Sequence, residues 1–141
     1  MGHYYRLFVQ RYARYIEPIA CTYAYCLLRN HFHLPVRTRT QEEQEALFET
    51  LKVFETFRVL SPSRQFSKLF SSYAKAFNKA YGRSGSLFER PFRRLEVEAD
   101  TYFTQLVAYI HQNPQRHGLV ADFRDWPFLS YEATRRVSRN P

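Results

Sequence analysis

The sequence has few cysteines, no long apolar run and no recognisable leader, and each absence excludes a class of protein. Only two cysteines, Cys21 and Cys26, occur among the 141 residues. They lie an odd number of residues apart on one expected strand, so their side chains should face opposite sides and not pair. No zinc-ribbon spacing is present, and no stretch of about 18 consecutive apolar residues could span a membrane. We therefore predict a soluble, cytoplasmic protein with reduced thiols and no membrane partner.

Internal repeats, low-complexity tracts and linker-like segments are also absent from the chain. The length fits a single domain over residues 1–141, which is long enough to bury a sizeable core. Apolar residues make up 45% of the sequence, and this share excludes wholesale disorder.

Acidic residues are scarce relative to basic ones. The chain has 13 Asp and Glu against 21 Lys and Arg, which gives a formal charge of +8, and 18% of its residues are aromatic. Cations bind phosphates and aromatic rings stack on bases, so this composition favours a nucleic-acid partner. The alternative is that the rings form the core and the charge only keeps the protein in solution.

Two histidines flank one large apolar residue at His31-Phe32-His33. In an extended strand the side chains alternate between faces, so the two imidazoles should lie side by side while Phe32 points into the core. Two such imidazoles form half of a divalent-metal site. The alternative is that both are ordinary surface or core residues, because a lone His-x-His pattern is a weak signal.

The hydrophobic pattern predicts four helices and four strands. Helices are expected over residues 3–16, 40–60, 62–80 and 101–113, and strands over residues 19–28, 31–37, 86–89 and 92–97. Their order indicates an α+β domain in which helices pack against an antiparallel sheet of about four strands. Pro35 lacks a ladder donor, so its strand should lie at an edge, carry a bulge or end by Leu34.

Several residues mark the expected helix ends. Thr40 and Asp100 are expected N-caps, and Pro114 and Gly118 are expected to end the last helix. On the second helix, Leu47, Leu51 and Phe54 form the expected apolar stripe.

The third helix combines an aromatic stripe with a wholly basic set of charges. Its rings recur at helical spacing at Phe66, Phe70, Tyr73 and Phe77, and its cations are Arg64, Lys68, Lys75 and Lys79. The segment that follows adds the arginines Arg83, Arg90, Arg93 and Arg94. These cations form either a phosphate-binding surface or a solvated face.

The last helix carries one tyrosine beside its apolar stripe. Tyr109 lies to the side of that stripe, and Asn113 follows one turn later on the same flank. A flanking tyrosine is either a partly buried packing residue or a functional group, and its position alone does not separate the two.

Four segments, taken together and in order, resemble the single-tyrosine HUH transposases. They are AYCLLRNHFHL at 24–34, FNKAYGRSGSLFERPFRRLEVEAD at 77–100, YIHQNPQRHGLV at 109–120 and WPFLSY at 126–131. The nearest branch is that of the REP-associated tyrosine transposases. The resemblance implies an HUH endonuclease fold, an elaboration of the ferredoxin-like fold.

The resemblance also implies a chemistry. His31, His33 and Asn113 would bind Mg²⁺ or Mn²⁺, and Tyr109 would attack a phosphodiester of hairpin-associated single-stranded DNA. The products would be a 5′-phosphotyrosine and a free 3′-hydroxyl, ready for rejoining. His111 lies on the other flank and is a weaker candidate than Asn113. The implied DNA-binding residues are Arg83, Arg90, Arg93, Arg94, Lys68, Lys75 and Lys79.

Three features depart from the family pattern. The chain begins at the first helix, so we expect an N-terminally shortened domain that lacks the family's first strand. Pro35 replaces an aliphatic residue, and the C-terminal tail is short. A missing strand would expose a sheet edge and favour a homodimer. The alternative to a nucleoid-associated transposase is therefore a catalytically inactive remnant that still binds hairpin DNA.

Overall fold

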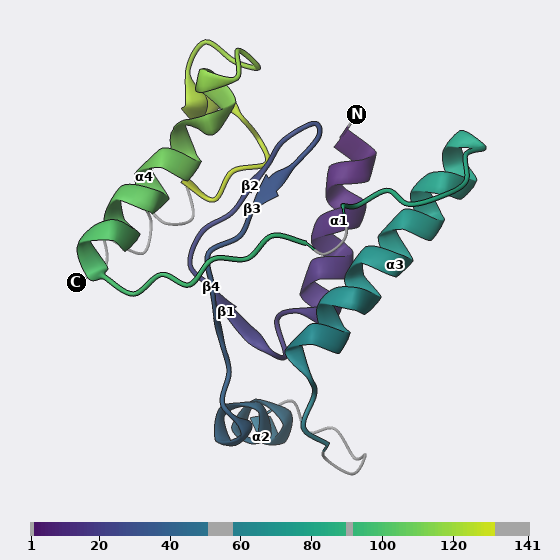
Figure 1. The fold of residues 1–141 in the computed structure, drawn as a ribbon, viewed down its shortest axis with the longest axis vertical. Coiled ribbons are helices and arrows are strands. Elements are labelled where there is room, and N and C mark those ends of the chain that lie inside the picture. The colour runs from purple at the N-terminus through teal and green to yellow at the C-terminus, as the bar shows by residue number, and fades with distance from the viewer. Residues whose placement is uncertain (1, 51–57, 90–91, 132–141) are drawn as a thin grey trace. The chain divides into compact units, whose positions relative to one another are not determined.

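A computed structural model describes residues 2–50, 58–89 and 92–131 of the chain (Figure 1). It forms two compact units, one made of residues 1–21 and 37–93 and the other of residues 22–36 and 94–141. The helices are α1 (Gly2–Tyr15), α2 (Gln41–Thr50), α3 (Pro62–Tyr81), α4 (Asp100–Arg116) and the 3-10 helix η1 (Phe123–Asp125). The strands are β1 (Ala20–Thr22), β2 (Cys26–Leu27), β3 (Phe32–His33) and β4 (Val36–Thr38). These elements confirm the α+β class.

The expected sheet of about four strands is instead two pairs, β1 with β4 and β2 with β3. Each long predicted strand is interrupted. The strand expected over residues 31–37 breaks after His33, because Pro35 has no N–H to donate. The position of Pro35 in the sequence predicts this break. The Pro35 carbonyl still accepts a hydrogen bond from the Tyr23 N–H at 3.0 Å, so the two interrupted strands stay in contact.

The predicted strands at 86–89 and 92–97 are wrong, because the described residues there form no strand. Aromatic packing takes the place of ladder bonds. The Phe88 and Phe92 rings lie 4.7 and 5.3 Å from the Phe70 ring of α3, between centroids. Burial of these rings holds the segment against the helix. Arg90 and Pro91, the expected turn, lie outside the described residues.

The first unit is built on the packing of α1 against α3. Ile16 and Leu69 are fully buried, and the Phe8 and Tyr73 rings meet edge to face at 5.4 Å. The predicted bounds of both helices are confirmed to within one residue. Ser61 caps α3 by accepting the Arg64 N–H. Gly82 ends the helix with φ of 59°, a left-handed conformation that suits glycine.

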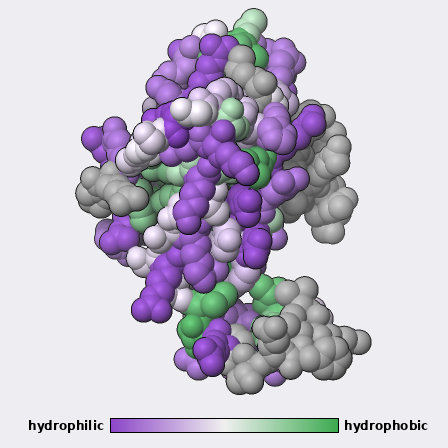
Figure 2. Space-filling view, turned by 90° about the vertical axis from the view of Figure 1, so that its right-hand side faces the viewer, coloured by the Kyte–Doolittle hydropathy of each residue, from purple (hydrophilic) through white to green (hydrophobic). Residues whose placement is uncertain are grey.

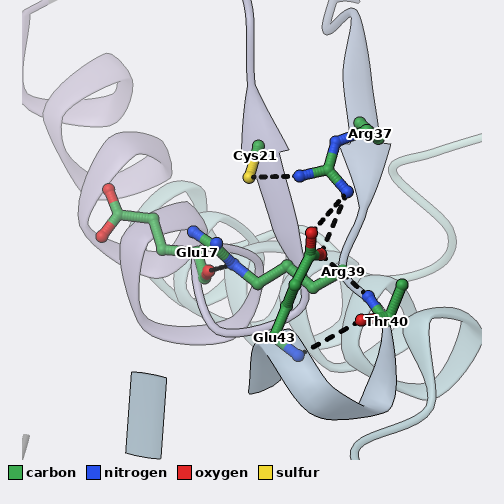
Figure 3. Close-up of polar contacts among 6 residues, drawn as sticks. All are labelled: Glu17, Cys21, Arg37, Arg39, Thr40 and Glu43. Carbon is green, nitrogen blue, oxygen red and sulfur yellow. Dashed lines mark hydrogen bonds and ion pairs between the residues drawn. The ribbon is translucent and has the colours of Figure 1, made fainter. Parts of the chain in front are cut away.

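Helix α2 begins with a reciprocal capping box (Figure 3). The Thr40 hydroxyl accepts the Glu43 N–H at 3.2 Å, and the Glu43 carboxylate accepts the Thr40 N–H at 3.0 Å. Arg37 donates to both oxygens of that carboxylate at 3.0 Å, and this hydrogen bonding lowers the pKa of Glu43. The predicted N-cap at Thr40 is confirmed, and Arg37 fixes the carboxylate that completes it.

The predicted helix over 40–60 is too long, because residues 58–60 are not helical. The backbone of Leu60 is held by the buried Gln44 side chain, which accepts its N–H at 2.9 Å and donates to its carbonyl at 3.2 Å. This pair of bonds replaces helical ones. The predicted stripe residues Leu51 and Phe54 lie outside the described residues.

The second unit places β2 between two partners. Cys26 and Leu27 pair antiparallel with His33 and Phe32 of β3. On the other side, the Leu27 N–H donates to the Phe128 carbonyl at 3.0 Å. The Trp126 indole N–H donates to the Leu27 carbonyl at 2.8 Å. Residues 126–131, the closing segment, therefore pack along the sheet and hold in place the strand that pairs with His33.

Helix α4 covers this sheet through a small apolar core. Cys26, Leu28, Ile110 and Leu129 are buried together. Ile110 belongs to the predicted apolar stripe of the helix, so the stripe direction is confirmed. Within the described residues, no helix combines the length and apolar character needed to cross a membrane.

The two free cysteines should differ strongly in reactivity. Cys26 is fully buried, and burial raises the pKa of its thiol to about 12, whereas Cys21 is only partly buried. The thiolate is the reactive form. We expect Ellman's reagent to modify one thiol per native chain and the second only after unfolding in urea. Cys26→Ser should leave the fast reaction unchanged, and equal rates for both thiols would contradict the burial of Cys26.

Candidate active site

Three residues predicted to act together meet in the second unit. His31 and His33 flank the start of β3, and their ring centroids lie 5.2 Å apart. The Tyr109 ring of α4 lies 6.3 Å from the His33 ring, between centroids. The neighbouring imidazoles confirm the predicted geometry of the His-x-His pattern.

His31 is oriented by the residue before it. Its Nδ1 lies 2.8 Å from Asn30 Oδ1. With the amide oxygen as the acceptor, Nδ1 is the donor of this bond and Nε2 keeps its lone pair. Burial first, and then the charge of His117, lower the pKa of His31. The ring is thus held neutral at neutral pH, with Nε2 able to bind a metal ion.

His33 has an unsatisfied nitrogen. Its Nε2 is the one buried side-chain nitrogen or oxygen for which no hydrogen-bond partner is found in the part of the chain that the structure describes. Burial, followed by the charges of His31 and His117, lowers the pKa of His33. Leaving such a group unpaired costs about 1–3 kcal/mol. A neutral imidazole with an unpaired nitrogen has the chemistry of a metal ligand.

Tyr109 is accessible and lies close to a cation. The residue is 44% exposed, and the guanidinium carbon of Arg116 lies 5.2 Å from its ring centroid. Arg116 also donates to the Gln112 side chain at 3.2 Å. A large substrate can therefore approach the phenol. The guanidinium of Arg116 offers a positive charge to the phosphate that the phenol would attack.

Asn113 is almost completely buried, at 1% exposure. Its side-chain nitrogen donates to the Tyr109 carbonyl at 2.9 Å. With Nδ2 committed to that bond, Oδ1 is the atom that could bind a metal ion. The role of Asn113 as the third ligand stays a prediction.

The predicted end of α4 needs correction. The helix runs through Pro114 to Arg116, and Asp100 is its first residue while Ala99 is the N-cap. A proline near the last turn removes few helical hydrogen bonds. Gly118 does follow the end, with φ of 68°. The longer helix therefore includes Arg116, and His117 is its C-cap.

His117 is a neighbour that the sequence analysis missed. Its ring lies 5.1 Å from the His31 ring, between centroids. The signal was its spacing, since it follows Asn113 by four residues and Tyr109 by eight. Among the described residues, no three His, Cys, Asp or Glu side chains form a group that could hold a metal ion. A metal ion held by His31 and His33 would therefore need Asn113, water or substrate oxygens to complete its coordination.

His111, the weaker candidate, makes a contact inside the core of the second unit. It is 6% exposed, and its Nε2 lies 3.0 Å from the Ser130 hydroxyl. That hydroxyl also accepts the Tyr25 N–H at 2.8 Å. His111 thus ties α4 to the closing segment.

This buried imidazole makes stability depend on pH. Burial lowers the pKa of His111 below its ordinary 6.5, so below pH 6.5 the unfolded chain binds more protons than the native one. The free energy of unfolding should fall by up to about 1.4 kcal/mol per pH unit below pH 6.5 and level off above it. Urea unfolding at pH 5.0 and 7.5 measures this change. The pKa values of His31 and His33 are lowered as well, so His111→Gln should reduce the dependence by the share of one histidine, and an unchanged slope in that variant would refute the assignment.

The predicted DNA-binding cations are exposed wherever the structure describes them. Arg83, Arg93, Lys68, Lys75 and Lys79 lie in the first unit and Arg94 in the second, while Arg90 lies outside the described residues. Figure 2 looks onto the side where α3 lies in Figure 1, and hydrophilic side chains dominate its centre. The stripe of cations on α3 is therefore a solvent-facing surface.

The chain is similar in sequence to a known protein. A protein of Haemophilus influenzae described as "Putative REP-associated tyrosine transposase" is 28% identical over 111 residues, which are 78% of this chain and 58% of that protein. The chain thus spans 58% of the length of this relative. No protein-family model and no solved structure matches the chain. The chain is therefore similar to a curated protein with the same family name that its four sequence motifs indicated.

Proposed function

We propose that the chain is a metal-dependent DNA transposase that cleaves and rejoins hairpin-associated single-stranded DNA. The observation that carries this proposal is the pair of neutral imidazoles beside an exposed tyrosine, with a buried nitrogen of His33 left unpaired. The similarity to a relative named as a tyrosine transposase supports the same reaction class.

The histidines fit the metal that this chemistry needs. His31 Nε2 and His33 Nε2 are the available donors, and Asn113 Oδ1 would be the third ligand. The ion, Mg²⁺ or Mn²⁺, would act as a Lewis acid that stabilises charge on the phosphodiester. The lowered pKa values of both histidines keep their lone pairs free for this purpose near neutral pH.

Tyr109 would supply the nucleophile. Its phenolic oxygen, after losing a proton, attacks the phosphorus and forms a 5′-phosphotyrosine. The bond from phosphorus to the 3′ oxygen breaks, and that oxygen leaves as a 3′-hydroxyl after taking up a proton. The reverse attack by a 3′-hydroxyl restores a phosphodiester, so no water or ATP is consumed. Arg116 lies where its charge can hold the phosphate during both steps.

The cations of the first unit and Arg94 would bind the phosphates of the DNA. Arg83, Arg93, Lys68, Lys75 and Lys79 are all exposed, and Arg90 is assigned with them from the sequence. Such contacts fix the position of DNA without reading its sequence. Their number should make binding weaken steeply as salt rises.

A labelled hairpin oligonucleotide tests the proposal. The protein is incubated with a single-stranded hairpin and Mn²⁺ or Mg²⁺, and products are separated on a denaturing gel. A label at the 3′ end should appear in a protein–DNA adduct, and a label at the 5′ end should appear in a shorter free strand. The opposite pattern would refute the proposed polarity. Retained hairpin binding without an adduct in either metal would instead identify an inactive hairpin-binding remnant.

A further inference from the structure

We infer that Tyr81, at the end of α3, is a stacking site for an unpaired base of single-stranded DNA. The inference rests on the proposed function only in taking DNA as the partner. It adds a base-binding position in the first unit, separate in sequence from the histidines and Tyr109. Four observations on described residues carry it: ring support, exposure, a neighbouring arginine and the absence of acidic residues on the two helices.

The Tyr81 ring is held from one direction by other rings. Its centroid lies 4.5 Å from Phe77, one turn earlier, and 4.9 Å from Tyr4 of α1. A hydrogen bond with Tyr4 is the main cause of the raised pKa of Tyr81. Tyr4 and Phe77 also contact each other at 5.3 Å. The ring is therefore oriented before any ligand binds, and little conformational entropy remains to be lost on stacking.

Exposure distinguishes Tyr81 from the rings that support it. Tyr81 is 56% exposed, whereas Tyr4 and Phe77 are partly buried. A core aromatic would be covered by other side chains, and a stray surface aromatic would lack a rigid support of rings. Tyr81 has the support and the open surface together. Every base has a π face, so a ring of this kind can stack on any unpaired base.

Arg83 gives the site a phosphate-binding group beside Phe77, one of the two rings that support Tyr81. Its guanidinium donates to Asn78 Oδ1 at 3.1 Å and lies 6.0 Å from the Phe77 ring centroid. Asn78 also donates to the Gly85 carbonyl at 3.0 Å, which fixes the loop that carries the arginine. A guanidinium has five N–H donors, so the bond to Asn78 leaves others for a phosphate.

The surrounding charge is favourable to a polyanion. Helices α1 and α3 contain no acidic residue, and their basic residues are Arg6, Arg11, Arg14, Arg64, Lys68, Lys75 and Lys79. The C-terminal end of α3 carries about half a negative charge, which repels an anion. Lys79 and Arg83 bring two full positive charges to the same turn, so attraction wins. An apolar or basic protein partner would not match this charge.

Substitution of the ring tests the inference without requiring cleavage. Tyr81→Leu keeps the side chain apolar but removes the π face, whereas Tyr81→Phe keeps the face. Fluorescence anisotropy without added metal gives the affinity for a labelled unstructured single strand and for a blunt duplex of equal length. We expect Tyr81→Leu to weaken single-strand binding by about tenfold, to leave duplex binding within about twofold, and Tyr81→Phe to bind like the wild type.

The salt dependence separates stacking from charge. Tyr81→Leu should keep the wild-type slope of log affinity against log salt, because no phosphate contact is lost. Arg83→Gln should reduce that slope by about 0.7, the value for one phosphate contact on a single strand. Tyr102, which is 48% exposed on α4, supplies the matched control. Tyr102→Leu should bind both DNAs normally.

Failure of this inference differs from failure of the proposed reaction. Unchanged single-strand affinity in Tyr81→Leu, or an equal loss for duplex, would overturn the stacking site even if the covalent adduct forms. A selective loss of single-strand affinity in Tyr81→Leu would support it even if no adduct forms. An equal loss in Tyr102→Leu would show that any exposed ring has the same effect and would overturn the assignment to Tyr81.

Discussion

Replacing Tyr109 by phenylalanine should abolish the covalent protein–DNA adduct and leave DNA binding intact. The substitution removes only the phenolic oxygen, which is the proposed nucleophile. The ring that meets His33 and Arg116 remains. Loss of a nucleophile costs at least about a thousandfold in rate, so adduct on the denaturing gel should fall below detection. Tyr109 is 44% exposed, so the unfolding free energy should change by less than about 0.5 kcal/mol.

A second tyrosine of the same helix provides the control. Tyr102 is 48% exposed, close to the value for Tyr109. Tyr102→Phe should form adduct at the wild-type rate with the same label polarity. An adduct that persists in Tyr109→Phe would assign the nucleophile to another residue. Loss of adduct in both variants would show that the assay responds to general damage, so circular dichroism of each variant accompanies the gel.

Much of the fold can be predicted from local patterns in the sequence. Helices α1 and α3 were predicted to within one residue because their apolar side chains recur at helical spacing and Ser61 and Gly82 mark the ends of α3. The neighbouring positions of the His31 and His33 rings are predicted correctly, because the alternation of side chains along an extended segment is also a local property. Such features depend on a few consecutive residues, so the sequence is enough to predict them.

Features that depend on distant contacts were less predictable. The expected strands at 86–89 and 92–97 have strand-like composition, but packing of Phe88 and Phe92 on Phe70 decides their conformation. The helix expected over residues 40–60 is too long, because the Gln44 side chain forms hydrogen bonds with the backbone of Leu60, sixteen residues away. A single sequence gives no signal for such a pairing. Propensity therefore yields to tertiary contacts here.

The candidate site shows the same division. Helical spacing and the resemblance indicate Tyr109 and Asn113, whereas an expected helix end at Pro114 leaves out Arg116 and His117. A proline near the end of a helix removes few bonds. The unpaired Nε2 of His33 could not be predicted at all, since burial and hydrogen bonding of one atom depend on the whole fold around it.

That unpaired atom leads to an unusual expected result for His33→Leu. In metal-free buffer the variant should be more stable than the wild type by about 1 kcal/mol, because a buried unsatisfied nitrogen is replaced by an apolar group. The wild type should gain stability on addition of Mn²⁺, by about 2.7 kcal/mol at a concentration one hundred times the dissociation constant. The variant should show no such gain, because one of its two imidazole ligands is lost.

The matched control is His111, a buried histidine of the same unit. His111 Nε2 has a partner in the Ser130 hydroxyl at 3.0 Å, so His111→Leu should lower the unfolding free energy by about 1–2 kcal/mol. Urea unfolding of the wild type and both variants at pH 7.5, with EDTA and then with Mn²⁺, measures these changes. Opposite signs for the two substitutions in EDTA, together with no gain from Mn²⁺ in His33→Leu, would support His33 as a metal ligand. Equal destabilisation would mean that His33 is a structural residue, and the metal site would lose its main support.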